Sequence, residues 1–166
     1  MSRVRMAGRR ARLLTAATAL TLLSPLASCS SASTAVEACM GKQAVSATTG
    51  ELEGTYTGEA HAKGVKITLK ASDTGTGGTV TVRNWPTGAW YKSELGETFD
   101  GSGTWGVEGG HQPGDHALVH LSFTEPELFL RDYTIDMLSI AKDSQRIYLY
   151  EDDDPDVCPT FRLRRA

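Results

Sequence analysis

The fold is decided by "VKITLKASDTGTGGTVTVR", residues 65–83. Val65, Ile67 and Leu69 alternate with polar residues, as Val80 and Val82 do further along. A period of two is typical of a strand with one buried and one solvated face. The linking "SDTGTGG" is rich in turn-forming residues, so the stretch predicts two antiparallel strands joined as a hairpin.

The same alternation continues on both sides of this hairpin. We expect further strands at 52–59, 98–107, 116–123, 129–137, 146–151 and 160–165, which brings the number to about eight. No segment shows a sustained helical stripe with caps. Strands in hairpin sequence favour an all-β, antiparallel, up-and-down barrel, with a β-sandwich as the alternative. A closed barrel has no exposed edge strand, which favours the first arrangement.

Two short motifs add a resemblance to this pattern. "GTYTG" at 54–58 is similar to the Gly-x-Trp opening of lipocalin-like barrels, with Tyr56 in place of the usual tryptophan. The chain ends in the arginine-rich "FRLRR". The resemblance implies an eight-stranded barrel in which an arginine of the last strand, Arg162 or Arg164, packs over Tyr56.

The N-terminal residues predict export. Five arginines precede a short apolar run from Leu13 to Leu23, as in a secretory signal peptide. The run is about half of the roughly 20 apolar residues that a membrane-spanning helix needs. Arg9 and Arg10 also suggest a twin-arginine signal, although Arg12 favours the general secretory route.

The exit of this segment, Leu26-Ala27-Ser28-Cys29, resembles the lipobox of bacterial lipoproteins. The resemblance implies removal of residues 1–28 and a diacylated Cys29. Two acyl chains hold a protein stably on a membrane, so we expect it at the outer face of the cytoplasmic membrane. The alternative is a secreted protein in which Cys29 is a free or intermolecularly paired thiol. Residues 29–50, rich in Ser, Ala and Thr, predict a flexible tether, and residues 51–166 the domain.

The charge of the processed chain restricts its partners. Removing residues 1–28 takes away five of the 17 Lys and Arg residues and none of the 20 Asp and Glu residues, so the formal net charge falls from −3 to −8. Binding nucleic acid needs a concentrated basic face. We therefore expect no nucleic-acid partner.

The other two cysteines, Cys39 and Cys158, are predicted to form a disulfide, because an oxidising compartment makes that the default. The bond would close a loop of more than a hundred residues. It would also make the beginning and the end of the domain neighbours, as a closed barrel requires. Two unrelated thiols are the alternative.

The longest connection between strands, 84–99, carries Trp85, Trp90 and Tyr91. These aromatic side chains are candidates for ligand or partner binding. They could equally form a lid folded onto the mouth of the barrel.

A speculative metal site involves His111, Asp115 and His116, with His120 on the same strand face as His116. Residues four apart on a strand are separated by about 13 Å, so His116 and His120 cannot reach one ion unless the strand bulges. Polar residues on a solvated face are the favoured interpretation.

The acidic run "EDDDPD" at 151–156 has alternate carboxylates, but the glycine and glutamate of a calcium loop are missing. We interpret it as a solvated turn.

The sequence carries no Gly-x-Ser-x-Gly elbow and no phosphate-binding loop before a helix. We therefore expect a non-enzymatic binding module without a cofactor. Its ligand would be a small apolar molecule inside the barrel, unless side chains fill the interior. The alternatives are an inhibitor or assembly partner of another cell-surface protein and a metal-binding enzyme. Nearly the whole chain resembles small actinobacterial lipoproteins of uncharacterised function.

Overall fold

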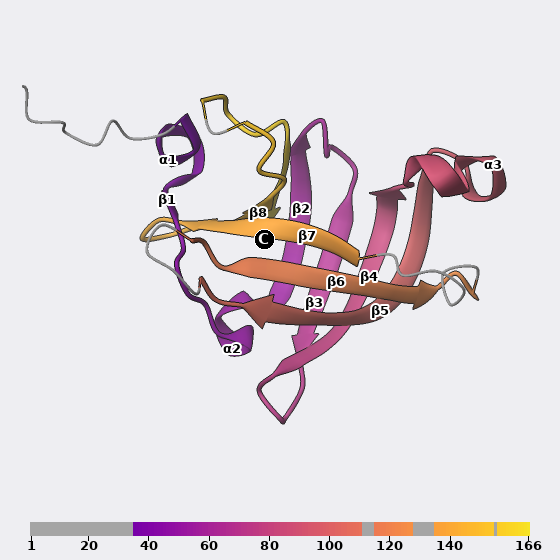
Figure 1. The fold of residues 1–166 in the computed structure, drawn as a ribbon, viewed down its shortest axis with the longest axis horizontal. Helices are drawn as coiled ribbons and strands as arrows, with labels where there is room; N and C mark the ends of the chain where they lie inside the picture. Colours follow the sequence, from indigo (N-terminus) through magenta and orange to yellow (C-terminus); the bar gives the residue numbers. More distant parts are fainter. Residues whose placement is uncertain (1–34, 111–114, 128–134, 155) are drawn as a thin grey trace, which may run out of the picture. The chain divides into compact units, whose positions relative to one another are not determined.

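The computed structural model describes residues 35–110, 115–127, 135–154 and 156–166. All of them belong to the second of two units into which the chain divides, Ala32–Ala166. Nine strands and four short helical segments lie in these ranges (Figure 1). The strands are β1 (Lys42–Gln43), β2 (Gly54–Ala60), β3 (Lys66–Ala71), β4 (Gly77–Pro86), β5 (Thr98–Glu108), β6 (Leu118–Glu125), β7 (Ile135–Lys142), β8 (Ile147–Tyr150) and β9 (Phe161–Arg165). The helical segments are α1 (Ala35–Met40), α2 (Thr49–Leu52), the 3₁₀ turn η1 (Ala89–Tyr91) and α3 (Lys92–Leu95).

Eight of the strands form a closed, up-and-down, antiparallel barrel. Each strand from β2 to β9 pairs with its neighbours in sequence, and β9 returns to pair with β2. In Figure 1, β2, β3 and β4 run up the page behind β5, β6 and β7, which run across it. The predicted all-β barrel is therefore confirmed, and the decisive hairpin pairs Ile67 with Val82 and Leu69 with Val80.

Every strand of the barrel contributes alternate side chains to its interior. The central cluster draws its buried side chains from β2 to β9 and includes Ile67, Leu69, Val82, Leu121 and Leu163. In a barrel of eight strands such side chains are enough to fill the interior. At one end, Trp85 packs against the rings of Phe123 and Phe161 at centroid distances of 5.8 and 5.6 Å.

The predicted boundary of one strand was wrong. We expected a strand at 129–137, whereas β7 runs from Ile135 to Lys142, and residues 128–134 lie outside the described part. Leu138 and Ile140 face the core. Ala141, on the outer face of β7, is also buried, because α1 covers it. Apolar and polar residues therefore do not alternate regularly from Met137 to Lys142.

Residues 35–50 differ from the flexible tether that we expected. Val36 and Met40, one helical turn apart on α1, are fully buried against Ala141, Tyr148 and Tyr150 on the outside of β7 and β8. Two apolar residues one turn apart are typical of a helix with one buried face, although the composition of the segment indicated a tether.

The segment after α1 completes one end of the barrel. β1 pairs with Ala141 and Lys142 of β7, beyond the point where β6 begins, and Ala44 bonds to the backbone of Ile140 on one side and Ala117 on the other. At α2, Thr48 and Glu51 form a reciprocal capping box. The hydroxyl of buried Tyr56 donates to Leu52 O at 2.8 Å, which fastens α2 to the barrel.

The arginine beside Tyr56 is Arg165, its cross-strand partner, and not Arg162 or Arg164. The reason is the period of two: Phe161, Leu163 and Arg165 share the side of β9 that Tyr56 occupies on β2. Arg162 and Arg164 lie on the outer side, where both contact the carboxylate of Glu59 at 3.3 Å. Burial raises the pKa of Tyr56 to about 12, with the charge of Arg165 acting in the opposite direction.

Candidate functional site

The three aromatic residues of the predicted connection 84–99 lie in two environments, because Trp85 belongs to β4 and only Trp90 and Tyr91 lie between β4 and β5. A bulge places two residues of β4, Arg83 and Asn84, opposite Asp100 alone on β5. Asn84 has a positive φ of 52°, and its N–H donates to Asp100 Oδ1 at 2.8 Å. The extra residue shifts the alternation by one, so Trp85 points into the barrel although it stands three residues after inward-facing Val82.

Trp85 is therefore a core residue, with 2% of its surface exposed. Its indole Nε1 donates to Asp136 Oδ2 at 2.7 Å. Burial raises the pKa of Asp136, and the hydrogen bond from Trp85 partly opposes that shift. Burial likewise raises the pKa of Glu151, with the charges of Asp153 and Asp136 adding to the effect. The prediction of Trp85 as a surface contact residue does not fit its burial, and the alternative of a lid describes it better.

Trp90 has the opposite environment, since 92% of its surface is exposed. It stands in η1, and Tyr91 at the end of η1 and Leu95 at the end of α3 pack against the core. The backbone N–H of Thr87 donates to Glu97 O at 2.9 Å and closes the base of this excursion. Tyr91 and Leu95 thus cover this end of the barrel, and they hold η1 in place so that Trp90 projects into solvent.

A groove of about 400 Å³ crosses the outer face of β5, β6 and β7. Its lining includes Asp115, His116 and His120. His120 lies on the outer face of β6 and His116 lies two residues before β6 begins, and both line the groove, while Ala117 and Val119 face inward. His120 Nε2 lies 2.8 Å from Glu108 Oε2.

The metal prediction gains no support from this groove. Among the described residues, no three His, Cys, Asp or Glu side chains are arranged to hold a metal ion. His111, the remaining member of the predicted site, lies outside the described residues.

The acidic run occupies the connection between β8 and β9. Asp152 Oδ2 accepts a hydrogen bond from Gln43 Nε2 at 3.1 Å. Asp154 Oδ1 accepts one from the backbone N–H of Asp156 at 2.9 Å, which forms a local turn. Their exposure agrees with a solvated turn.

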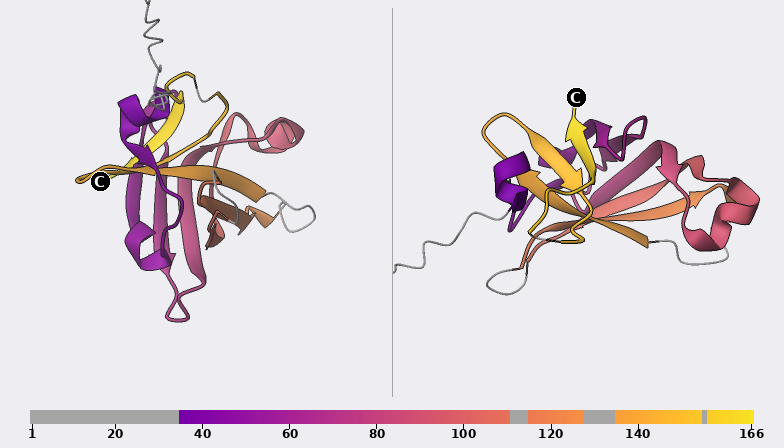
Figure 2. Two further views of the ribbon diagram at one scale, coloured as in Figure 1. Left: turned by 60° about the vertical axis from the view of Figure 1, so that its left-hand side comes forward. Right: turned by 90° about the horizontal axis from the view of Figure 1, so that it is seen from above.

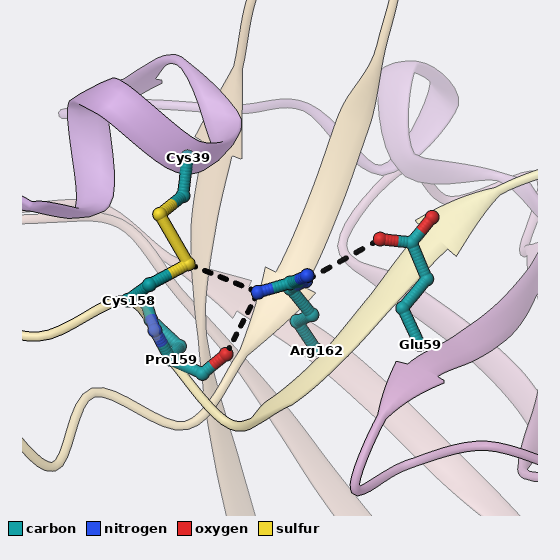
Figure 3. The surroundings of a disulfide bond; sticks show 5 residues. All are labelled: Cys39, Glu59, Cys158, Pro159 and Arg162. Carbon is teal, nitrogen blue, oxygen red and sulfur yellow. Dashed lines mark hydrogen bonds and ion pairs between the residues drawn. A yellow bond between two sulfur atoms is a disulfide. The ribbon is translucent and has the colours of Figure 1, made fainter.

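The predicted disulfide between Cys39 and Cys158 is present, with a Cα–Cα distance of 6.0 Å. It joins the last turn of α1 to the residues before β9. In Figure 3 the Arg162 guanidinium lies beside it, where Nη1 donates to Cys158 Sγ at 2.9 Å and to Pro159 O at 3.2 Å. Sequence reasoning missed this contact, because it requires the outward orientation of Arg162.

Cys29, the predicted lipidation site, lies outside the described residues. Within the ranges that are described, no helix is long and apolar enough to cross a membrane.

Comparison with protein-family models, with curated proteins and with solved structures finds no significant match to this chain.

Proposed function

We propose that this protein is a membrane-anchored lipoprotein at the outer face of the cytoplasmic membrane that binds another cell-surface protein without catalysing a reaction. Trp90 is the central contact residue. The observation that carries this proposal is the 92% exposure of a tryptophan in η1, a turn that Tyr91 and Leu95 hold against the core. Tryptophan is among the residues most enriched in interface hot spots, and leaving one in water is unfavourable.

The packing of the barrel favours a partner outside over an apolar ligand inside. The rings of Trp85, Phe99, Phe123 and Phe161 occupy one end of the interior, with centroid distances of 5.2 to 5.8 Å between neighbouring rings. Aliphatic side chains of the same cluster, including Ile67, Leu69 and Leu121, also face the interior. A ligand would have to displace these contacts.

The position of α3 agrees with the same proposal. α1 and α3 lie on opposite sides of the barrel in all three views (Figures 1 and 2), and η1, which carries Trp90, leads directly into α3. The N-terminal helix α1 therefore does not cover Trp90.

The anchor is tested by Cys29→Ser. Loss of the acylated sulfur should move the protein from the membrane fraction to the medium, because the lipid is the proposed anchor and the described residues contain no helix that could span a membrane. Immunoblotting of both fractions measures this. A variant that stays in the membrane fraction contradicts the lipid anchor.

The contact residue is tested by a photoreactive amino acid at position 90 in intact cells. The crosslinked adducts should all contain the same partner protein. The affinity of that partner for the purified barrel is then measured by calorimetry. Trp90→Ala should weaken that binding by about 30-fold, since a hot-spot tryptophan contributes about 2 kcal/mol or more.

Met137→Ala is the matched control, because Met137 is an exposed apolar residue, 56% accessible, on the barrel wall. It should leave the affinity unchanged. Equal losses in the two variants, or no crosslinked protein at position 90, would exclude Trp90 as the contact residue.

A further inference from the structure

The two sulfurs of the Cys39–Cys158 disulfide have different surroundings. Cys158 Sγ accepts a hydrogen bond from the Arg162 guanidinium at 2.9 Å. Cys39 packs instead against the apolar cluster formed by α1, β7 and β8. A neighbouring cation favours the thiolate form of a cysteine, whereas apolar surroundings disfavour it.

The guanidinium is held in place on three sides. Besides the sulfur, Arg162 contacts Pro159 O through Nη1 and Glu59 Oε2 through Nε, the latter at 3.3 Å (Figure 3). Arg162 itself belongs to β9, which is paired with both β2 and β8. Because none of these contacts involves Cys39, we expect the cation to stay beside Cys158 when the bond to Cys39 is broken.

This asymmetry gives the bond a chemical direction. In thiol–disulfide exchange an incoming thiolate attacks one sulfur, and the other leaves as a thiolate. The sulfur whose thiolate is better stabilised leaves faster. Both cysteine residues are partly exposed, as reaction with a thiol from solution requires.

We propose that the Cys39–Cys158 disulfide is a site of directional exchange, at which the thiolate of a protein dithiol attacks Cys39 Sγ and Cys158 leaves as a thiolate held by Arg162. The first step breaks the S–S bond and forms a mixed disulfide between the dithiol and Cys39. The second thiol of the reductant then attacks its own mixed-disulfide sulfur and releases Cys39. In total, two electrons and two protons pass from the dithiol, which becomes a disulfide, to the two cysteines.

Reduction would remove the covalent link between α1 and the residues before β9 without opening the barrel. The ring is closed by the backbone pairing of β2 with β9 and of β7 with β8, neither of which includes a cysteine. After reduction, the burial of Val36 and Met40, the backbone bonds of β1 and the side-chain bonds of Gln43 to Tyr150 and Asp152 still hold the N-terminal segment to the barrel. The exchange would thus control how firmly the segment before the barrel is attached to it.

The first test identifies the attacked sulfur in the unmodified full-length protein. Glutathione is added as a monothiol probe, the reaction is quenched with acid at early times, and peptide mapping by mass spectrometry locates the adduct. We expect the Cys39 adduct to exceed the Cys158 adduct by roughly tenfold. Equal adducts, or an excess on Cys158, would overturn the proposal.

The second test removes the cation. Arg162→Gln should slow the reduction roughly three- to tenfold and bring the two adducts towards equal amounts, because the leaving thiolate loses its stabilisation. Arg164→Gln is the matched control, since Arg164 also pairs with Glu59 but on its far side from the disulfide. A similar slowing in both variants would show that the effect does not come from the contact with sulfur.

A third measurement does not depend on the stability of the Arg162 variant. In Cys39→Ser, the pH dependence of alkylation should show that Cys158 has a thiol pKa below that of Cys39 in Cys158→Ser. The reverse order would contradict the assigned direction.

Discussion

Trp85 and Trp90 stand five residues apart, and replacing each by alanine should have very different effects on stability. Trp85 is 2% exposed and Trp90 is 92% exposed. Trp85→Ala removes a ring that packs against Phe123 and Phe161 and also removes the donor to Asp136. Trp90→Ala removes a ring that lies in solvent.

The expected magnitude for Trp85 follows from its buried area and its contacts. A tryptophan side chain buries roughly 200 Å², which at about 25 cal/mol per Å² corresponds to about 5 kcal/mol. Alanine retains part of this, and core truncations of this size cost about 3–5 kcal/mol. Loss of the hydrogen bond to Asp136 adds about 1 kcal/mol. We expect Trp85→Ala to lower the free energy of unfolding by about 5 kcal/mol and Trp90→Ala by less than about 0.5 kcal/mol.

Urea denaturation followed by circular dichroism measures both values. A loss of about 5 kcal/mol approaches the total stability of many domains, so Trp85→Phe provides a milder variant. Phenylalanine keeps most of the ring contact and loses the indole donor, and we expect a loss of about 2 kcal/mol. The assignment of Trp85 to the core and Trp90 to the surface would be refuted if the two alanine variants were equally stable, or if Trp90→Ala were the less stable one.

Three other perturbations test separate parts of the structure. Burial raises the pKa of Asp136 above its usual 3.8, so the folded state binds more protons than the unfolded state and stability falls as the pH rises above that value. In Asp136→Asn the amide oxygen still accepts from the indole, so the melting temperature of this variant should rise relative to that of the natural protein as the pH increases from 4 to 7. A difference that stays constant across this range would contradict the buried carboxyl. Tyr56→Phe removes the hydroxyl that donates to Leu52 O, and we expect a loss of about 1 to 2 kcal/mol in urea denaturation, whereas unchanged stability would mean that α2 is held by other contacts. Cys39→Ser opens a crosslink between residues 119 apart and should cost about 5 kcal/mol by the chain-entropy model, again measured in urea, with a loss below 1 kcal/mol as the contradicting result.

Sequence pattern located the strands well where one face is buried and the other solvated. The hairpin of β3 and β4 is the clearest case, because Ile67 and Leu69 on one strand and Val80 and Val82 on the other all face the core. The pattern failed at β7, where Ala141 is buried on the outer side by α1. A local period cannot show that a second element will cover the other face.

The N-terminal segment shows a different limit. Ser-, Ala- and Thr-rich composition indicated a tether, whereas residues 35–52 pack on the barrel. Local signals were present, namely Val36 and Met40 one turn apart and the capping box of Thr48 and Glu51. They are weak in so short a segment, since isolated helices of this length are not stable without tertiary packing.

By itself, the sequence determined the all-β class and favoured both the up-and-down order of the barrel strands and the pairing of Cys39 with Cys158, because alternation is local and the chain offered few disulfide partners. Only the tertiary structure decided which tryptophan is core and which is surface. That assignment depends on one extra residue in β4 opposite Asp100, which shifts the side-chain alternation before Trp85. The position of Arg162 beside Cys158 also depends on the fold, because the register of β9 against β2 and β8 decides which arginines face outward.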